Sequence, residues 1–184
     1  MKGDKVVGIF PITGGRDAIV RYATEDDLKD IFAIIQDRRF ERSLREGEKM
    51  RILTNAEKAT WLPEIQNPGK IVLVVETNNI VCGLIDIGKH SNCGDDTALV
   101  YSIAVLTSHR NKKLGRALLV CGIQEATDQL KVHSVELWAT LQNIHAVNLY
   151  RSLGFQQKGE ILPNATKWNR QPADRINMVK QFSS

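Results

Sequence analysis

The sequence predicts an α/β protein with a mixed central sheet of six to seven strands and helices on both faces. Runs rich in β-branched residues alternate along the chain with segments whose apolar residues recur at helical spacing. Two of these runs, "IVLVVE" and "IVCGLIDI", flank Thr77-Asn78-Asn79, a sequence typical of a tight hairpin turn. The 184 residues are enough for one core and few for two domains.

The first part of the chain is interpreted as an extension followed by the start of a domain. Residues 1–17 are expected to form the N-terminal extension, and residues 18–184 a single domain. "AIVRY" is the first predicted strand. Thr24 followed by Asp27 predicts a capping box, and the residues behind it carry the apolar spacing of a helix.

A second helix start precedes the predicted hairpin. Thr54 and Glu57 have capping-box spacing, and Pro63 is expected to end this shorter helix soon after it. The charge-rich residues 38–51 between the two helices are expected to form a solvated, partly helical connection.

The second half of the chain continues the alternation. "ALVYSIAV" predicts a strand that ends at Val105, and "VELWA" predicts another. A helix over about 144–153 is expected to end at Gly154, and "FQQKGEI" and "RINMVKQF" predict two last strands joined by a loop that includes Trp168. A long amphipathic helix is predicted between "ALVYSIAV" and "VELWA". Its predicted buried stripe is Ala117, Leu118, Ile123, Ala126 and Leu130.

Composition limits the class of protein. Hydrophobic content of 42%, charged content of 25% and a net charge of +4 are those of a soluble globular protein with a mild basic bias. That bias suits an anionic ligand and is too small for a nucleic-acid-binding tail. The three cysteines (Cys82, Cys93, Cys121) form no disulfide framework, and we find no signal peptide or membrane-spanning run. We expect a cytoplasmic protein with no membrane or nucleic-acid partner.

The segment "SHRNKKLGRALL" places four cations (Arg110, Lys112, Lys113 and Arg116) where the long helix begins. The first turn of a helix is its positive end, so these cations oppose the macrodipole unless an anion lies across them. A phosphate group is the usual anion at a loop that follows a strand and opens a helix. Taken alone, the segment fits equally well a set of solvated surface charges with Gly115 as a loop residue.

A second segment, "NIHAVNLYRSLGF", places Asn143 and Tyr150 two helical turns apart, so both project on one face. Taken singly, Asn143 is explained as a helix cap and Tyr150 as a core residue. Together the two segments resemble the GNAT superfamily of acetyl-CoA-dependent N-acetyltransferases. That family has a strand ending in valine, then R/Q-x-x-G-x-G/A opening a helix, and later N-x-x-A-x-x-L-Y-x-x-L-G-F.

The resemblance implies that acetyl-CoA is the co-substrate and lies where two neighbouring parallel strands separate. The strand backbone is expected to bond the acetyl carbonyl and pantetheine, the basic loop to cradle the pyrophosphate, and Ala146 to leave room for the cofactor. Lys113 replaces the usual first glycine of the motif and is expected to fit with a negative φ. The implied cofactor contacts are Ile103, Ala104, Val105, Arg110, Asn111, Lys112, Lys113, Leu114, Gly115, Arg116, Asn143, Ala146 and Tyr150.

The implied reaction is direct attack of a primary amine on the thioester in a ternary complex. Tyr150, whose ordinary pKa is near ~10, is expected to donate a proton to the departing sulfur. Glu136 and Tyr101 are the two candidates for the base, because Trp138 stands where some relatives have a carboxylate. The alternative is a catalytically weak or inactive acyl-CoA sensor or interaction protein of the same fold.

The acceptor amine is expected to be a small molecule or a peptide or protein N-terminus, and the protein a monomer or homodimer. The implied groove, formed by residues 36–62 and 160–174, has basic and aromatic side chains instead of the acidic wall that a polyamine needs. They are Arg38, Arg39, Arg42, Trp61, Trp168 and Arg170. No metal site is expected, because His90 and Cys93 have no second pair of ligands.

Overall fold

The computed structural model describes residues 5–12, 17–43, 55–90, 96–169 and 171–182, with residues 38–43 and 55–60 described by their backbone alone. Eight strands form one sheet in the order β1-β2-β3-β4-β5-β6-β8-β7, and β5 and β6 are parallel neighbours. The strands are β1 (Val6–Pro11), β2 (Asp17–Tyr22), β3 (Lys70–Thr77), β4 (Ile80–Lys89), β5 (Thr97–Val105), β6 (Ser134–Thr140), β7 (Gln156–Trp168) and β8 (Gln171–Gln181).

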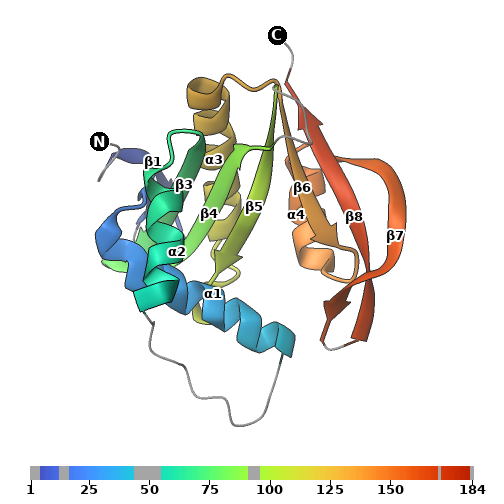
Figure 1. Ribbon diagram of the computed structural model, residues 1–184, viewed down its shortest axis with the longest axis horizontal. Helices are drawn as coiled ribbons and strands as arrows, with labels where there is room; N and C mark the ends of the chain where they lie inside the picture. The colour runs from blue at the N-terminus through green and yellow to red at the C-terminus, as the bar shows by residue number, and fades with distance from the viewer. Residues whose placement is uncertain (1–4, 13–16, 44–54, 91–95, 170, 183–184) are drawn as a thin grey trace.

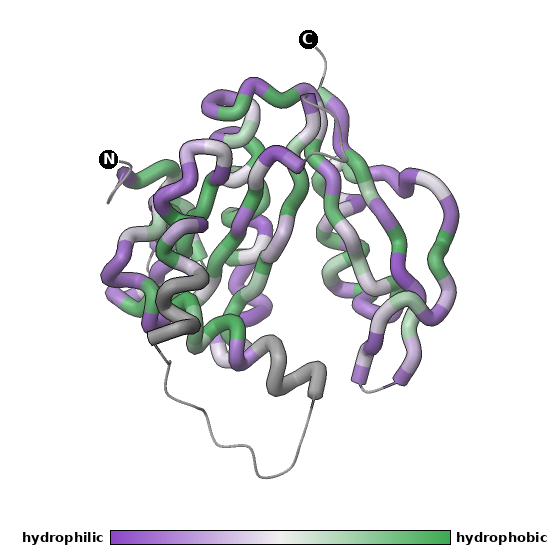
Figure 2. Tube along the Cα trace, viewed as in Figure 1, coloured by the Kyte–Doolittle hydropathy of each residue, from purple (hydrophilic) through white to green (hydrophobic). Residues whose placement is uncertain are grey.

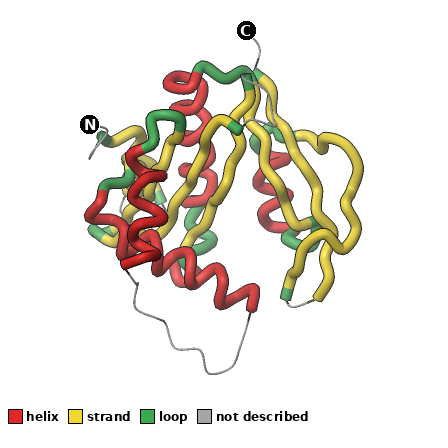
Figure 3. The backbone as a smooth tube through the Cα atoms, in the orientation of Figure 1, coloured by secondary structure: helices red, strands yellow, loops and turns green. Residues whose placement is uncertain are grey.

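Within the described residues, four helices cover the two faces of the sheet (Figures 1 and 3). They are α1 (Leu28–Ser43), α2 (Asn55–Gln66), α3 (Leu114–Leu130) and α4 (Ile144–Ser152), and short 3-10 turns, η1 (Glu25–Asp27) and η2 (Thr107–His109), precede α1 and α3. α1 and α2 lie on one face and α3 and α4 on the other; we call these the α1–α2 face and the α3–α4 face. No helix among the described residues is long and apolar enough to cross a membrane.

Each face buries its own hydrophobic cluster. The larger cluster lies on the α3–α4 face and includes all five residues of the predicted stripe of α3. The smaller cluster joins α1 to β3, β4 and β5 through residues such as Ile31, Val74 and Leu84. Figure 2 shows the corresponding concentration of hydrophobic residues in the central strands. The predicted mixed α/β architecture is therefore confirmed.

The local turn and cap predictions are also confirmed. Asn78 and Asn79 have φ of 53° and 61°, the two positive values that a type I′ hairpin turn requires. Gly154 has φ of 88° directly after α4, so only a residue without a Cβ fits there at little cost. Asp27 accepts a hydrogen bond from the Thr24 backbone N–H at 2.8 Å, as the capping box predicts.

The predicted strand count was too low. β1 lies within the segment interpreted as an extension and pairs antiparallel with β2. Its Gly8 leaves no space for a side chain, because an added Cβ would lie 2.6 Å from the Phe10 ring and 2.8 Å from Cys121 Sγ. The short apolar run of β1 therefore adds an eighth strand packed on α3, while the domain boundary at residue 17 stays a prediction.

One other boundary differs from its prediction. Residues around Trp168 continue β7 where a loop was expected, and the hairpin with β8 is irregular between Lys158 and Thr166. The end of α2 agrees with its prediction: Pro63 lies in the last turn, and the helix ends three residues later at Gln66. The proposed Thr54–Glu57 cap and most of the charge-rich connection lie outside the described residues.

A buried ion pair fixes the entry into α1. Arg21 Nη1 and Nη2 donate to the two carboxylate oxygens of Asp27 at 2.7 and 2.8 Å, and Arg21 Nε donates to Glu76 at 3.1 Å. Burial alone raises the pKa of Asp27, but hydrogen bonds from Arg21 and Thr24 outweigh it and leave this pKa below its usual value. The pair therefore joins β2 to the turn that starts α1.

We predict that Asp27→Asn lowers the free energy of unfolding by about 3 kcal/mol at neutral pH, because it leaves Arg21 partly buried without its bidentate partner. Since the folded pKa is lowered, the stabilisation is present above the unfolded pKa of about 4 and is lost as pH falls through the folded value. Urea unfolding at pH 7 and at acidic pH measures the difference, which shrinks in acid. Asp26→Asn, at an exposed neighbour, is the matched control; an equal loss there contradicts the assignment.

Candidate active site

The sheet opens between β5 and β6 (Figure 1). Their pairing ends at Val100 with Leu137, whereas β5 continues to Val105 and β6 to Thr140. The opening follows a β-bulge: Ile87 pairs with Val100 and Asp86 with Ser102, so Tyr101 is the extra residue. A bulge bends its strand and increases its twist, which turns the end of β5 away from β6.

The direction of the β5 backbone follows from its bonds to β4. The Leu106 N–H donates to the Cys82 carbonyl at 2.8 Å. Because backbone groups alternate sides along a strand, Ala104 also faces β4, while the N–H and C=O groups of Ile103 and Val105 face the opening. Of the three predicted strand residues, two therefore present their backbone to the opening.

The loop between β5 and α3 carries a row of free donors. In the part of the chain that the structure describes, the backbone N–H groups of residues 111–115 have no backbone acceptor. The N–H groups of Arg116 and Ala117 donate to the Lys113 carbonyl at 3.0 and 3.1 Å, which closes the first turn of α3. Free N–H groups at the positive end of a helix suit an anion.

Asp37 of α1 holds the start of this loop. Its carboxylate accepts from the Thr107 backbone N–H at 2.8 Å and from the Thr107 hydroxyl at 2.9 Å. The two residues lie 70 positions apart, so no local pattern in the sequence could reveal the contact. The loop is therefore anchored to the α1–α2 face.

Lys113 differs from its prediction. Its φ is 63°, in the left-handed region, where a negative value was expected. Asn111 has φ of 62°, so two residues of this tight loop have positive φ. A left-handed conformation costs an L-residue about 1–2 kcal/mol relative to its usual regions. The position therefore has the geometry that favours glycine, the residue usual in the family motif.

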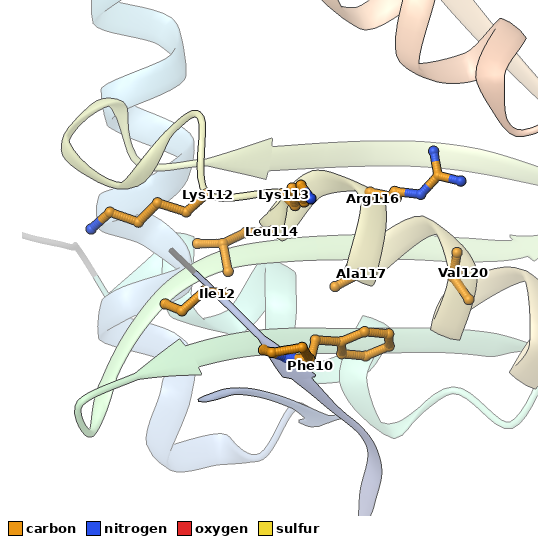
Figure 4. A pocket seen from close by; sticks show the side chains of 9 residues that line it. Phe10, Ile12, Lys112, Lys113, Leu114, Arg116, Ala117 and Val120 are labelled. Carbon is orange, nitrogen blue, oxygen red and sulfur yellow. The ribbon is translucent and has the colours of Figure 1, made fainter. Parts of the chain in front are cut away.

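The four predicted cations surround the loop. Arg110 Nε donates to the Val105 carbonyl at 3.4 Å, and Arg116 Nη1 donates to Ser152 Oγ of α4 at 3.0 Å, which links α3 to α4. Lys112, Lys113 and Arg116 also edge a pocket of about 250 Å³ between β1 and α3 (Figure 4). Its other lining residues are apolar: Phe10, Pro11, Ile12, Leu114, Ala117 and Val120.

α4 brings its two predicted residues to the α3–α4 face. Asn143 caps the helix by accepting the Ala146 N–H at 3.3 Å. Tyr150 is buried and packs edge-on against Phe155, with ring centroids 6.1 Å apart. Gly115 lies close by, since a Cβ there would be 3.5 Å from Leu149 Cδ2. The start of α3 and the body of α4 therefore contact each other.

Both candidate bases already have partners. Glu136 is 4% exposed; its carboxylate accepts from Lys158 Nζ, and from Asn177 Nδ2 at 2.8 Å. The Tyr101 hydroxyl donates to the Lys89 carbonyl at 3.1 Å. Because Lys89 pairs with Ala98, this hydroxyl points toward the start of β5 and away from Val105.

A pair that the sequence did not reveal lies on the α1–α2 face of β6 and β8. The guanidinium of Arg175 stacks over the Trp138 ring at 4.3 Å, and Trp138 is 39% exposed. Of the predicted groove residues, Trp61 packs against the smaller core cluster. The side chains of Arg38, Arg39, Arg42 and Arg170 lie outside the described residues, as does Cys93 of the rejected metal pair.

Comparison with known proteins gives one consistent result. A model of the "Acetyltransferase (GNAT) family" matches residues 28–155. The chain is 34% identical over 106 residues to the mycothiol acetyltransferase of Pseudarthrobacter chlorophenolicus, a match that covers 56% of this chain and 32% of that protein. It is 32% identical over 114 residues to the L-amino acid N-acyltransferase MnaT of Escherichia coli K12, covering 61% of this chain and 66% of that protein.

Comparison of the structures agrees with comparison of the sequences. The structure of yncA from Salmonella typhimurium, solved with its cofactor acetyl-CoA, superposes with a TM-score of 0.75 at 25% sequence identity, covering 91% of this chain and 95% of that chain. By contrast, this chain spans about a third of the length of the mycothiol acetyltransferase that it matches.

We predict that Lys113→Gly raises the free energy of unfolding by about 1 kcal/mol, because glycine adopts positive φ without the Cβ penalty. For a chain of this size that corresponds to a rise in Tm of about 2–4 °C. Lys112→Gly is the matched control: Lys112 is the neighbouring lysine and its φ is not positive, so glycine there lowers Tm. Equal shifts in the two variants would contradict a left-handed Lys113.

Proposed function

Because the chain belongs to the GNAT family of acetyltransferases, we propose that it transfers the acetyl group of acetyl-CoA to a primary amine. The observation that carries the proposal is the opening between β5 and β6, with the N–H groups of residues 111–115, which have no backbone acceptor among the described residues, at its end. A thioester with a pantetheine arm and a pyrophosphate needs a strand edge and an anion site in this order. The residues present therefore fit the co-substrate.

The cofactor contacts divide among three elements. The backbones of Ile103 and Val105 bond the acetyl carbonyl and the pantetheine arm, and the N–H groups of Asn111, Lys112, Lys113, Leu114 and Gly115 receive the pyrophosphate. Arg110 and Arg116 supply further positive charge beside it. Asn143 holds the pantetheine amides, and Ala146 leaves space for the arm.

The chemistry is a direct attack within a ternary complex. The amine nitrogen forms a bond to the thioester carbonyl carbon, the C–S bond breaks, and coenzyme A leaves with a proton on sulfur. The Val105 N–H stabilises negative charge on the carbonyl oxygen. Tyr150 donates the proton to sulfur and is restored by the proton that the amine releases.

Both candidates for the base are already engaged by other groups. Glu136 is held by Lys158 and Asn177, and the Tyr101 hydroxyl points away from Val105. The α-amine of a peptide has an ordinary pKa near ~8 and is partly neutral at pH 7–8, whereas a carboxylate beside the amine raises that pKa, so such an acceptor must lose its proton to a base or to water before it attacks. Glu136 and Tyr101 each lie one residue from the last β5–β6 pair, Val100 with Leu137, so position along the strands does not choose between them.

Two kinds of observation bear on the alternatives. The names of the matched relatives, a mycothiol acetyltransferase and an L-amino acid N-acyltransferase, support an enzyme. The strained Lys113 and the tryptophan at position 138 favour the second candidate, an acyl-CoA sensor without activity. The two functions share cofactor binding and differ in turnover.

We predict that saturating acetyl-CoA stabilises the protein by about 3 kcal/mol at a hundredfold excess over Kd, measured as a rise in Tm. Lys113→Glu reduces this shift, because its charge opposes the phosphates. Lys167→Glu, on the exposed strand β7, is the matched control and keeps the shift. Absence of any shift at millimolar acetyl-CoA overturns both the enzyme and the sensor.

We predict that Tyr150→Phe lowers kcat about a hundredfold in an amine panel while the thermal shift with acetyl-CoA persists, because a general acid acts in the transition state. Release of the coenzyme A thiol measures turnover. Tyr101→Phe is the comparison variant and is expected to keep its kcat. A similar fall in kcat in Tyr101→Phe would mean that the proton transfer cannot be assigned to Tyr150 alone. Full activity of Tyr150→Phe at every pH shows the assignment to be wrong.

A further inference from the structure

Three side chains share one patch on the α1–α2 face beyond the end of the β5–β6 pairing. Trp138 pairs with Asn177 across β6 and β8, and Thr140 pairs with Arg175. Directly opposed residues of antiparallel strands point to the same face. The neighbouring residues Leu137 and Ile176 belong to the core on the α3–α4 face, so Trp138, Arg175 and Asn177 point the other way.

The patch stands at the opening itself. Leu137 is the last residue of β6 that pairs with β5, so Trp138 is the first side chain past it on the α1–α2 face. A molecule that approaches the thioester from this face meets Trp138 and its two neighbours on β8. The β5 side of the same face is formed by Ser102 and Ala104, which are small.

Arg175 is held in place without a carboxylate. Its guanidinium lies 4.3 Å from the Trp138 ring, and no described Asp or Glu lies within ion-pair distance of it. The adjacent Asp174 points to the other side, where it accepts from the Asn164 N–H at 3.1 Å. A guanidinium stacked on an aromatic ring keeps its N–H edge available for a bidentate bond to a carboxylate.

Asn177 orders the patch beside Arg175. Its Nδ2 donates to Glu136 at 2.8 Å, which fixes the orientation of the amide. Its Oδ1 is buried and has no hydrogen-bond donor among the described residues. This oxygen has no contact with solvent, so we assign Asn177 a part in positioning Glu136 and no direct contact with the acceptor.

The position of Arg175 along the sheet suits the binding of a carboxylate. Arg175 pairs with Thr140, which lies three residues past the last β5–β6 pair. A carboxylate held by its guanidinium therefore lies beside the part of the opening that leads toward Val105, and an amine on the same small molecule is brought to that opening.

We propose that Arg175, stacked on Trp138, forms the acceptor subsite and selects an amine that also carries a carboxylate, with the carboxylate bound by the Arg175 guanidinium. This inference rests on the proposed acetyl transfer and names its acceptor class. A polyamine is disfavoured because it has no anion for Arg175, and the N-terminus of a protein is disfavoured because its α-carboxylate is an amide.

The test compares amino acids with their amides. The protein saturated with coenzyme A is titrated calorimetrically with a panel of common L-amino acids and with the matched carboxamides, and acetylation of both sets is followed by thiol release. The best acids are expected to bind about 10- to 100-fold more tightly than their amides, as a charged hydrogen bond implies. Arg175→Gln removes this preference and raises KM for the acids, while KM for acetyl-CoA stays unchanged.

Two further variants separate recognition from folding. Arg175→Lys keeps the charge and loses the bidentate geometry, so it restores part of the preference for acids. Lys167→Gln removes an exposed cation from the same hairpin and keeps the full preference. A normal thermal shift with acetyl-CoA in each variant shows an intact fold.

The outcomes distinguish the inference from the function on which it rests. If acids bind no better than amides, or Arg175→Gln weakens both equally, the acceptor assignment is overturned whether or not acetyl is transferred. If acids bind in preference and no amine is acetylated, the subsite stands and the enzyme proposal fails in favour of an amino-acid-responsive sensor.

Discussion

The end of the β5–β6 pairing at Val100 and Leu137 is the constraint on which the rest of the structure depends. The bulge at Tyr101 costs ladder bonds and turns β5 away from its parallel neighbour. Lys70 braces this bulge: its ammonium lies 4.1 Å from the centre of the Tyr101 ring and 3.5 Å from Asp86 Oδ2. The N–H groups of Ile103 and Val105, which a continuous sheet would use to pair with β6, therefore remain available to a ligand.

The start of α3 is a second place where the free protein is destabilised in a way that a bound ligand would relieve. Cations at a helix N-terminus and a lysine in the left-handed region each destabilise the free protein by up to about 1–2 kcal/mol. Asp37 and Ser152 hold the loop from α1 and from α4, so the strain persists without a ligand. Strain held by the surrounding structure is typical of a site whose binding partner compensates for it.

The sequence predicts what depends on neighbours along the chain. The Asn78-Asn79 turn, the stripe of α3 and the Gly154 cap are short-range patterns, and the structure has all three. The eighth strand and the contacts of Asp37 and Arg175 depend on groups distant in sequence, whereas the positive φ of Lys113 had a local signal in the glycine of the family motif. For the candidate site, the sequence therefore identified the loop and α4, and it missed the groups that hold the loop and face the acceptor.

The opening has positively charged side chains at two separate places, one for each substrate. On one side, the cations of the β5–α3 loop meet an anionic co-substrate; on the other, Arg175 stands beside the opening with Glu136 already paired to Lys158. An acceptor that carries several positive charges would meet this guanidinium, which has no carboxylate partner among the described residues, at close range, where two like charges repel. An acceptor with a carboxylate beside its amine reverses the sign of that interaction and carries the nucleophile to the open edge of β5. The same opening that admits the thioester therefore restricts what can reach it from the opposite face.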